Sequence, residues 1–248
     1  MTETVVVVGA TGEMGRAICR DLLARDYDVL AIARSHDALT ALAGDLPGLR
    51  CCVADISSDD AIEAIRAELV HDVRGVVHGP GVATAGGALT APTSAVVDAV
   101  NIKVGGFMRL ARAVDARLQR QSRLIAIGGH YGFEPSAYAA TAGVANAALA
   151  NLVRQFSWAY GERGVTAHLL VPGPADTPRL RRVADARAER DGITTEDVLE
   201  SMRGESAIGQ FTTLESVAWA VTMLLDPRAD AMAGGPLYMD SGRRHGIS

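Results

Sequence analysis

Short apolar runs alternate along the chain with longer stretches in which apolar residues recur every three or four positions. A short run rich in β-branched residues is typical of a buried strand, and the longer spacing is typical of a helix. The runs predict strands at 5–8, 28–33, 49–54, 75–78, 124–127, 165–171 and 237–239. The spaced stretches predict helices at about 13–25, 36–43, 58–70, 93–119, 139–161 and 213–225.

This regular alternation of strand and helix defines the expected fold class. Successive strand–helix–strand units cross over with right-handed connections, which gives a parallel sheet covered by helices on both faces. The chain shows no linker, repeat or low-complexity tract, so we predict a single doubly wound α/β domain of about seven strands over residues 1–248. The one long stretch that breaks this alternation is 174–210, a polar, charge-rich insertion that we expect to be a lid or a disordered loop.

Residues 4–18, TVVVVGATGEMGRAI, join the first predicted strand to the first predicted helix through a glycine-rich turn. Gly9, Gly12 and Gly15 let the backbone approach a ligand closely, and the free N–H groups at the helix start favour a phosphate. A glycine pattern alone is weak evidence, but its place between a strand and a helix strengthens it. The alternative is a tight turn that binds nothing.

Composition and charge narrow the classes of function. With 48% hydrophobic residues and 26 glycines among 248, the chain is typical of a globular protein with a substantial core. A formal net charge of -5 offers no basic face, so we expect no nucleic-acid partner. Three cysteines, two of them adjacent in an apolar run, indicate reduced core residues and a cytoplasmic location. We see no leader and no apolar run of membrane length, and we expect no membrane association and no bound metal.

The residues that follow the predicted strands bear on the choice of ligand, because a doubly wound sheet binds its ligand outside the carboxyl ends of the strands. Arg34 and Ser35 follow the second strand, where a carboxylate would favour NAD and an arginine would pair with a 2′-phosphate. We therefore predict NADP(H); the alternative is that Arg34 is only a solvated residue at a helix start. Asp55 follows the third strand, where it would accept from an adenine amino group, cap a helix beginning near Ser57 and Ser58, or do both.

Several motifs together resemble the short-chain dehydrogenase/reductase superfamily, from Val5 to about Gly242. The opening GATGEMG resembles its glycine turn, with Glu13 in place of the middle glycine, and residues 54–56 (ADI) resemble its adenine-contacting aspartate segment. Residues 77–81 (VHGPG) stand where the family has two asparagines, both absent here, and residues 100–102 (VNI) resemble its active-site asparagine motif.

Near the carboxyl end, Pro172-Gly173 with Thr177 resembles the segment whose threonine holds the nicotinamide carboxamide, and residues 235–242 resemble the last strand and its turn. The resemblance implies a Rossmann-type fold. It also implies cofactor contacts from Gly9, Thr11, Glu13, Met14, Arg34, Ser35, Asp55, Ile56, Gly79, Pro80, Pro172, Gly173 and Thr177.

The catalytic centre departs from the family pattern of a serine, a tyrosine thirteen residues later and a lysine four beyond it. A gapless register back from Pro172-Gly173 places Gly129 at the serine position, Ala142 at the tyrosine position and Asn146 at the lysine position. The alternative register takes Tyr138 as the tyrosine but needs a compensated deletion and insertion, and it still offers Ala142 for the lysine. In both registers the lysine is absent.

Four nearby side chains are the candidates for the catalytic work. His130 would titrate near the working pH and suits proton delivery, and Tyr138 would donate through its phenol. Asn101 and Asn146 can bind a carbonyl or order water, but an amide is not a base at neutral pH. The alternatives are a histidine hydrogen-bonded within a loop and an aromatic residue that only packs at a helix start.

The insertion carries Arg179, Arg181, Arg182, Arg187 and Arg190 beside several acids. We interpret these as the solvated face of a lid helix, the alternative being that one or two of them grip an anionic or phenolic substrate. The apolar residues of the insertion would close over an apolar ligand and exclude water.

The function favoured by these residues is NADPH-dependent reduction of a small to medium, partly apolar carbonyl, enone or imine by an atypical site. The retained nicotinamide segment favours it, whereas the missing side chains favour a non-redox cyclase, isomerase, dehydratase or lyase, or an NADP(H)-binding regulatory protein. The resemblance also implies a homodimer or homotetramer. The alanine-rich helix at 139–150 would allow close approach at such an interface, or would equally pack within one subunit.

Overall fold

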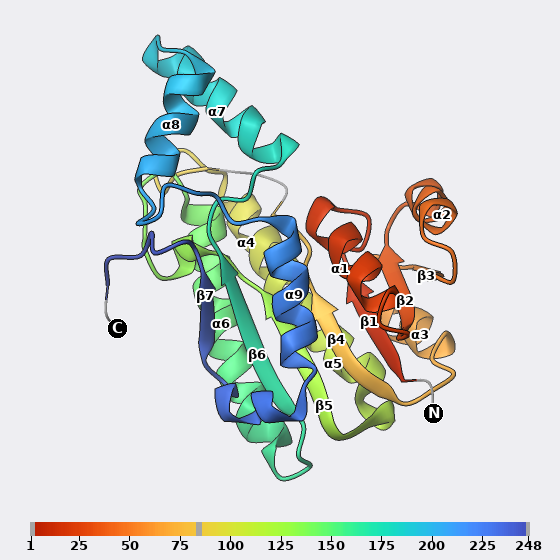
Figure 1. Ribbon diagram of the computed structural model, residues 1–248. Coiled ribbons are helices and arrows are strands. Elements are labelled where there is room, and N and C mark those ends of the chain that lie inside the picture. The colour runs from red at the N-terminus through yellow and green to blue at the C-terminus, as the bar shows by residue number, and fades with distance from the viewer. Residues whose placement is uncertain (1–2, 83–85, 247–248) are drawn as a thin grey trace.

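The four valines at 5–8 lie in strand β1 (Thr4–Val8), and every residue of this strand is buried. Strands β2 (Asp28–Ala33) and β4 (Val73–His78) flank it, both parallel to it. The computed structural model, which describes residues 3–82 and 86–246, shows the sheet built outward from this central strand (Figure 1).

The sheet has seven strands in the order β3-β2-β1-β4-β5-β6-β7, and each neighbouring pair is parallel. The remaining strands are β3 (Arg50–Val53), β5 (Leu118–Ile127), β6 (Thr166–Pro172) and β7 (Pro236–Met239). The chain runs outward from β1 to β3, returns, and continues in the opposite direction from β4. This arrangement confirms the predicted fold class and places a topological switch point between β1 and β4, where such sheets bind ligands.

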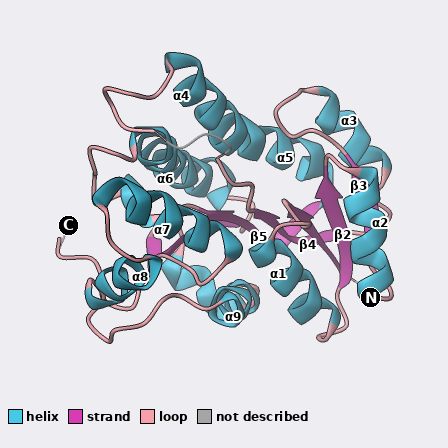
Figure 2. Cartoon of the chain, turned by 90° about the horizontal axis from the view of Figure 1, so that it is seen from above, coloured by secondary structure: helices cyan, strands magenta, loops and turns pink. Residues whose placement is uncertain are grey.

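Alternate side chains of the strands pack into two separate hydrophobic cores, one on each face of the sheet. Val6 and Val8 pack with helices α3 (Asp60–Ala67), α5 (Gly106–Val114) and α6 (Ala140–Gly161). Val5 and Val7 pack with helices α1 (Glu13–Leu23), α2 (His36–Asp45) and α9 (Leu214–Leu224). Figure 2 shows the two helical layers on either side of the strands. Burial on both faces explains why these strands are continuous apolar runs.

The long helix predicted at 93–119 is wrong in detail. Helix α4 (Thr93–Val100) passes into a π-helical turn, η1 (Asn101–Gly105), and then into α5, and a 3₁₀ turn, η2 (Asp115–Arg117), precedes β5. The chain approaches the sheet closely at this point, because a Cβ at Gly106 would lie only 2.9 Å from the ring of His78. The wider turn changes the direction of the side chains that follow Val100, and π turns of this kind are frequent at functional sites.

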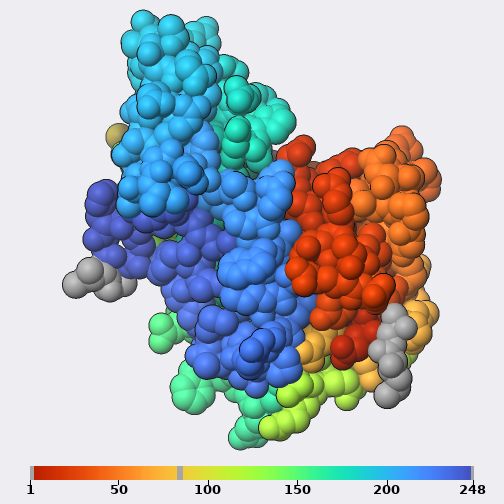
Figure 3. All heavy atoms as spheres, viewed as in Figure 1, coloured from red at the N-terminus to blue at the C-terminus, as the bar shows by residue number. Residues whose placement is uncertain are grey.

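The insertion at 174–210 is largely helical and has a small core of its own. Thr177 caps α7 (Pro178–Asp191), and Thr194 forms a capping box at the start of α8 (Thr195–Gly204). The two helices pack together through Leu180, Ala184, Ala188, Val198, Leu199 and Met202. In Figure 3 they form a lobe that rises above the rest of the surface, beside the region of α1.

Two short 3₁₀ turns complete the described elements, η3 (His130–Gly132) after β5 and η4 (Pro227–Met232) before β7. In the part of the chain that the structure describes, no helix combines the length and apolar character needed to cross a bilayer. Nor do residues 3–82 and 86–246 bring three or more His, Cys, Asp or Glu side chains together in a metal-binding arrangement.

Candidate functional site

The turn between β1 and α1 has the close backbone packing that its glycines predicted. Gly9 adopts a φ of 83°, which favours glycine, and a Cβ there would lie 3.1 Å from the backbone of Gly79 and Pro80. A Cβ at Gly15 would lie 2.7 Å from the Cα of Ala10 and closer still to the Gly9 carbonyl oxygen. The first turn of α1 therefore lies directly against the ends of β1 and β4.

The start of α1 is open to a ligand. Gly12 is the N-cap residue and provides no side chain to bond the first N–H groups of the helix. The guanidinium of Arg16 turns toward α2 and pairs with Asp45 at 3.0 Å, and Glu13 is exposed. Neither side chain blocks the turn, so the N–H groups of the first turn are placed to receive a phosphate.

The residues after β2 and β3 form the adjoining part of this surface. Ser35 caps α2 through a 3.2 Å hydrogen bond from the Ala38 N–H, and Arg34 is exposed. The Asp55 carboxylate accepts from the N–H and the hydroxyl of Ser57, at 3.0 and 2.7 Å. These hydrogen bonds lower the pKa of Asp55, and the charge of Arg34 lowers it further. The expectation that Asp55 caps a helix starting near Ser57 is wrong, because α3 starts at Asp60 and Asp55 closes the turn before it.

A cleft of about 350 Å³ opens beside the switch point, between the carboxyl ends of the strands and helices α6 and α7. Met14, Gly79 and Pro80 line it on the α1 side, and Pro172, Gly173 and Thr177 line it on the β6 side. The same cleft contains Lys103, Gly129, His130, Tyr131, Tyr138, Thr141, Ala142, Asn146, Arg179 and Arg187. The fold thus brings together most of the site residues expected from the sequence.

The Pro172-Gly173 segment turns sharply out of β6. A Cβ at Gly173 would lie 2.9 Å from the Cα of Asp240, so only glycine fits there without displacing the chain after β7. Thr177 accepts a hydrogen bond from the Leu180 N–H at 3.3 Å and donates one to the Ala175 carbonyl at 3.2 Å. Its hydroxyl therefore holds the start of α7 at the edge of the cleft.

Asn101 lies outside the cleft lining, and this differs from the expectation that it could bind a carbonyl or order water. Its amide Nδ2 donates to the Ser57 carbonyl at 3.0 Å, and its Oδ1 accepts from Arg109 at 3.0 Å. These bonds tie the π turn to the loop after β3. Asn101 thereby positions the residues that follow it, Lys103 among them.

Tyr131 and Tyr138 form a hydrogen-bonded pair in the cleft, with their hydroxyl oxygens 2.9 Å apart. The Arg187 guanidinium lies 4.6 Å from the centre of the Tyr138 ring. Burial raises the pKa of Tyr131 to about 12. Burial acts in the same direction on Tyr138, but hydrogen bonds with Tyr131 and Ser136 and the charge of Arg187 outweigh it and lower its pKa. Tyr138 precedes the first residue of α6 and is half exposed.

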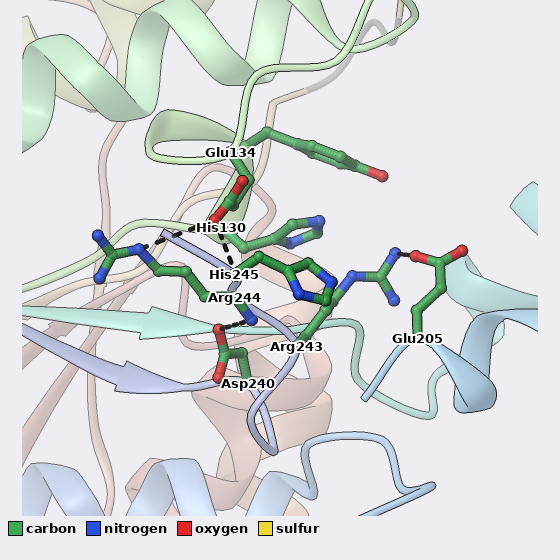
Figure 4. Close-up of a pocket in the computed structure, with 8 residues that line it drawn as sticks. His130, Glu134, Glu205, Asp240, Arg243, Arg244 and His245 are labelled. Atoms are coloured by element: carbon green, nitrogen blue, oxygen red, sulfur yellow. Dashed lines mark hydrogen bonds and ion pairs between the residues drawn. The ribbon is translucent and has the colours of Figure 1, made fainter. Parts of the chain in front are cut away.

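His130 lies between the cleft and a second cavity of about 200 Å³. Figure 4 shows it beside Glu134, Arg243 and Asp240, with Arg243 paired to Glu205. Burial lowers the pKa of His130 to about 4, with a further contribution from Arg243, and Asp240 and Glu134 only partly oppose this shift. The expectation that His130 titrates near the working pH is therefore wrong, because its imidazole is neutral there.

Helix α6 presents two buried polar atoms without a hydrogen-bond partner among the described residues, the hydroxyl of Thr141 and Oδ1 of Asn146. Asn146 is 5% exposed, and its Nδ2 lies 3.0 Å from the position that a Cβ at Gly129 would take. Since buried polar groups are normally paired, these atoms are available to a ligand in the cleft. Asn146 thus packs against Gly129 in the wall of the cleft.

Lys103 is the residue of the site that the sequence interpretation missed. The residue is 6% exposed and lies in the cleft wall, and its ammonium donates to the Ile127 carbonyl at 2.8 Å. Burial lowers its pKa to about 8, and the charge of Arg179 contributes to this shift. One signal was available, since the chain holds this one lysine among 24 basic residues, all the others being arginine.

The arginines of α7 divide between the cleft and the solvent. Arg179 and Arg187 line the cleft, and Arg179 donates to the Val82 carbonyl at 3.3 Å. Arg190 pairs with Asp191 at the surface. The interpretation of this set as a purely solvated face is therefore wrong for the two arginines that face the cleft.

A seven-stranded parallel sheet with a glycine turn and a cleft at its switch point defines a dinucleotide-binding protein of the doubly wound class. Residues 9–244 match the family model described as enoyl-(acyl carrier protein) reductase. The chain belongs to this family of the short-chain dehydrogenase/reductase superfamily.

Curated relatives and solved structures agree with this assignment. The chain is 26% identical over 244 residues to the 3-oxoacyl-(acyl-carrier-protein) reductase FabG of Escherichia coli, covering 96% of this chain and 95% of the relative. It is 29% identical over 259 residues to the short-chain dehydrogenase/reductase eriH of Hericium erinaceus, covering 96% of each. The structure of a single-residue variant of actinorhodin polyketide ketoreductase with NADPH superposes with a TM-score of 0.91 at 22% identity, covering 99% of this chain and 98% of that one.

Proposed function

We propose that this protein is an NADPH-dependent reductase of a small to medium, partly apolar substrate that carries a reactive carbonyl, enone or imine. The observation that carries the proposal is the single cleft in which Gly79, Pro80, Pro172, Gly173 and Thr177 meet the candidate catalytic residues. A reductase needs its nicotinamide and its substrate held against each other, and a shared cleft provides that alignment.

The residues of the turn fit a dinucleotide phosphate. A side chain at Gly15 would occupy the space against Gly9 and Ala10, and the first turn of α1 has no capping side chain. Arg34, exposed and close enough to Asp55 to lower its pKa, would pair with a 2′-phosphate. Two structural relatives, the actinorhodin ketoreductase variant and BdcA, are complexes with NADPH, and a third, YwfH, is an NADPH-dependent reductase. We therefore assign NADP(H) as the cofactor.

We propose further that the site lacks the serine, tyrosine and lysine usual in the superfamily. Gly129 facing Asn146, with Ala142 in the same cleft, supports the gapless register in which these three residues occupy those positions. The bound cofactor supplies a hydride. Asn146 and Thr141 offer hydrogen bonds to the substrate or the cofactor, Tyr138 orients the substrate, and α7 and α8 exclude water.

The test is a binding measurement followed by turnover. Calorimetry should detect NADPH binding more tightly than NADH, and the absorbance of NADPH should then decay with at least one member of a panel of quinones, enones, imines and β-keto esters. Absence of NADPH binding would overturn the proposal. Tight binding without oxidation across the panel would instead favour a non-redox enzyme or a regulatory protein.

We also propose that the protein is a homo-oligomer that pairs through α4 and α6. Val97, Val144 and Trp158 of these helices are exposed, at 66%, 51% and 87%. Light scattering after size exclusion should give a dimer or tetramer, and Trp158→Lys should shift it toward the monomer. A monomeric wild-type protein at micromolar concentration would contradict this proposal.

A further inference from the structure

Lys103 differs from the other basic residues of the chain in its residue type and in its buried position. The chain uses arginine at every other basic position, including all those on the surface, and retains its one lysine in the wall of the cleft. Arginine keeps its charge at any physiological pH, whereas a buried lysine can give up its proton. The position is therefore occupied by the basic residue that is able to transfer a proton.

The π turn directs Lys103 toward the cleft. Asn101 anchors the start of this turn through Ser57 and Arg109, and α6 packs against the turn. One proton of the ammonium is donated to the Ile127 carbonyl at 2.8 Å. An ammonium has three donors, so two remain for a ligand. Gly129 and Ala142, which line the same cleft, carry no side-chain acceptor for these two donors.

The charged side chains that line the cleft with Lys103 are all positive. The cleft lining in the described part of the chain holds Lys103, Arg179 and Arg187 but no aspartate or glutamate. The titratable and charged groups that face it come from several elements: His78 of β4, His130 and Tyr131 of η3, Tyr138 before α6, and Arg179 and Arg187 of α7. Burial and the charge of Lys103 lower the pKa of His78 to about 3, so His78 is neutral and offers no counter-charge.

We propose that Lys103 is the proton donor to the substrate oxygen or nitrogen in this reductase. Lys103 lies outside α6 and performs the proton transfer that Ala142 and Asn146 of α6 cannot perform. The proposal rests on the reductase function proposed above. Neutral His130 and the amides of the cleft are poorer proton sources, and the lowered pKa of Lys103, about 8, suits proton transfer near neutrality.

The balance of the step is simple for a carbonyl substrate. Bound NADPH would supply the hydride, with its two electrons, that forms the new C–H bond at the carbonyl carbon, and NADP⁺ would be left. The π pair of the C=O bond moves to the oxygen, which takes a proton from the Lys103 ammonium as an O–H bond forms. Lys103 is left as a neutral amine and regains a proton from water.

The first test needs no substrate. Protein grown with [ε-¹³C]lysine gives one lysine signal, because Lys103 is the one lysine in the chain. We expect this signal to titrate with a midpoint near 8. Arg179→Gln should move the midpoint upward by removing a neighbouring positive charge, and Arg190→Gln, a matched change on the exposed face of α7, should leave it in place. A wild-type midpoint near the ordinary lysine value of 10.5 would overturn the proposal.

The second test uses the panel substrate that the wild-type protein reduces. We expect kcat/KM to fall above about pH 8 in the wild type, as the ammonium loses its proton. Lys103→Met should lower kcat by about 100-fold or more and remove this basic limb. Lys103→Arg keeps the charge but gives up no proton at these pH values. Its kcat/KM should therefore also show no fall above about pH 8.

Two controls show whether these variants still fold and bind the cofactor: NADPH binding by calorimetry and the midpoint of thermal unfolding. Unchanged kcat and an intact basic limb in Lys103→Met would overturn the role of Lys103 and leave the reductase function standing. A wild-type protein that oxidises NADPH with no member of the panel would overturn both.

Discussion

The hydroxyl oxygens of Tyr131 and Tyr138 lie 2.9 Å apart in the cleft, and Arg187 of α7 covers the Tyr138 ring. The pair joins the loop after β5 to the segment that precedes α6, and Arg187 joins both to α7. A substrate entering the cleft meets a phenol whose hydrogen bond is already shared. Because Lys103 is the proposed proton donor, we assign to Tyr138 the orientation of the substrate.

Tyr138→Phe is therefore expected to weaken substrate binding more than it slows the chemical step. Loss of one neutral hydrogen bond is worth about 1 kcal/mol, so KM should rise about 3- to 10-fold while kcat changes little. Steady-state kinetics with the panel substrate, compared with Tyr131→Phe, measure this. If kcat instead falls by about 100-fold or more, Tyr138 is the general acid and the role proposed for Lys103 is wrong.

Gly15→Ala should weaken NADPH binding strongly. The new Cβ would lie 2.7 Å from the Ala10 Cα, and backbone cannot move away as a flexible side chain can. We expect the affinity for NADPH, measured by calorimetry, to fall by about 100-fold or more, with a lower midpoint of thermal unfolding. Gly44→Ala makes the same chemical change in α2, where nothing lies within 4 Å, and it should leave binding intact. Equal binding by the two variants would contradict the phosphate role of the turn.

Much of the fold could be predicted from the sequence, because burial on both faces leaves a plain apolar signal. The valines of β1 and the glycines at 9 and 15 have local causes, namely a covered strand and a close backbone approach. The π turn at 101–105 has no such signal, since its residues continue the apolar spacing of α4. The close approach of the next residue, Gly106, to His78 and Ile56 exists only in the folded chain.

Met14, Gly79, Pro80, Pro172, Gly173 and Thr177, which the sequence assigned to one site, do line one cleft, whereas the residues opposite them were harder to predict. The position of Lys103 depends on that π turn, so helical spacing alone did not direct it to the cleft. The neutral state of His130 depends on burial and on Arg243, which lies more than a hundred residues away in the sequence. Likewise, Arg179 and Arg187 share α7 with solvated arginines, and only the docking of the helix separates the two groups.

Arg34→Asp should change the choice of nucleotide. A carboxylate would repel the 2′-phosphate of NADPH and accept from the ribose hydroxyls of NADH, so we expect NADPH affinity to fall by about 10- to 100-fold while NADH affinity changes less. Calorimetric titration with both nucleotides measures the ratio. Arg20→Asp, an equal change of charge at an exposed position of α1, is the control. A parallel loss for both nucleotides would show that Arg34 does not contact the 2′-phosphate.

Acid should destabilise the folded protein through its buried histidines. Burial lowers the pKa of His168 to about 4, against 6.5 for an ordinary histidine. Between these values the unfolded chain binds more protons than the folded one, so the free energy of unfolding decreases as pH falls. Each such histidine contributes up to about 1.4 kcal/mol per pH unit in this window.

Urea unfolding from pH 7 to pH 4 measures this dependence. His168→Gln should flatten the fall in unfolding free energy, although it also removes the 2.8 Å hydrogen bond with Thr166 and lowers stability at pH 7. His36→Gln, at an exposed position, is the matched control and should leave the slope as in the wild type. An unchanged slope in His168→Gln would show that His168 takes up its proton in the folded protein at the same pH as in the unfolded chain.

The lid formed by α7 and α8 should unfold locally when its small core is reduced. Leu199 is 1% exposed and packs among a few apolar side chains of these two helices, with little support from the main cores. Truncation of a buried leucine to alanine costs about 2–5 kcal/mol, which is a large share of the stability available to so small a cluster. Leu199→Ala should therefore speed amide hydrogen exchange across 178–204 and raise KM for the panel substrate, since residues of both helices line the cleft. Ile193→Ala, at a residue 49% exposed between the same helices, should change neither measurement. Faster exchange that spreads equally through β1 and β4 would mean that the lid unfolds only with the whole domain.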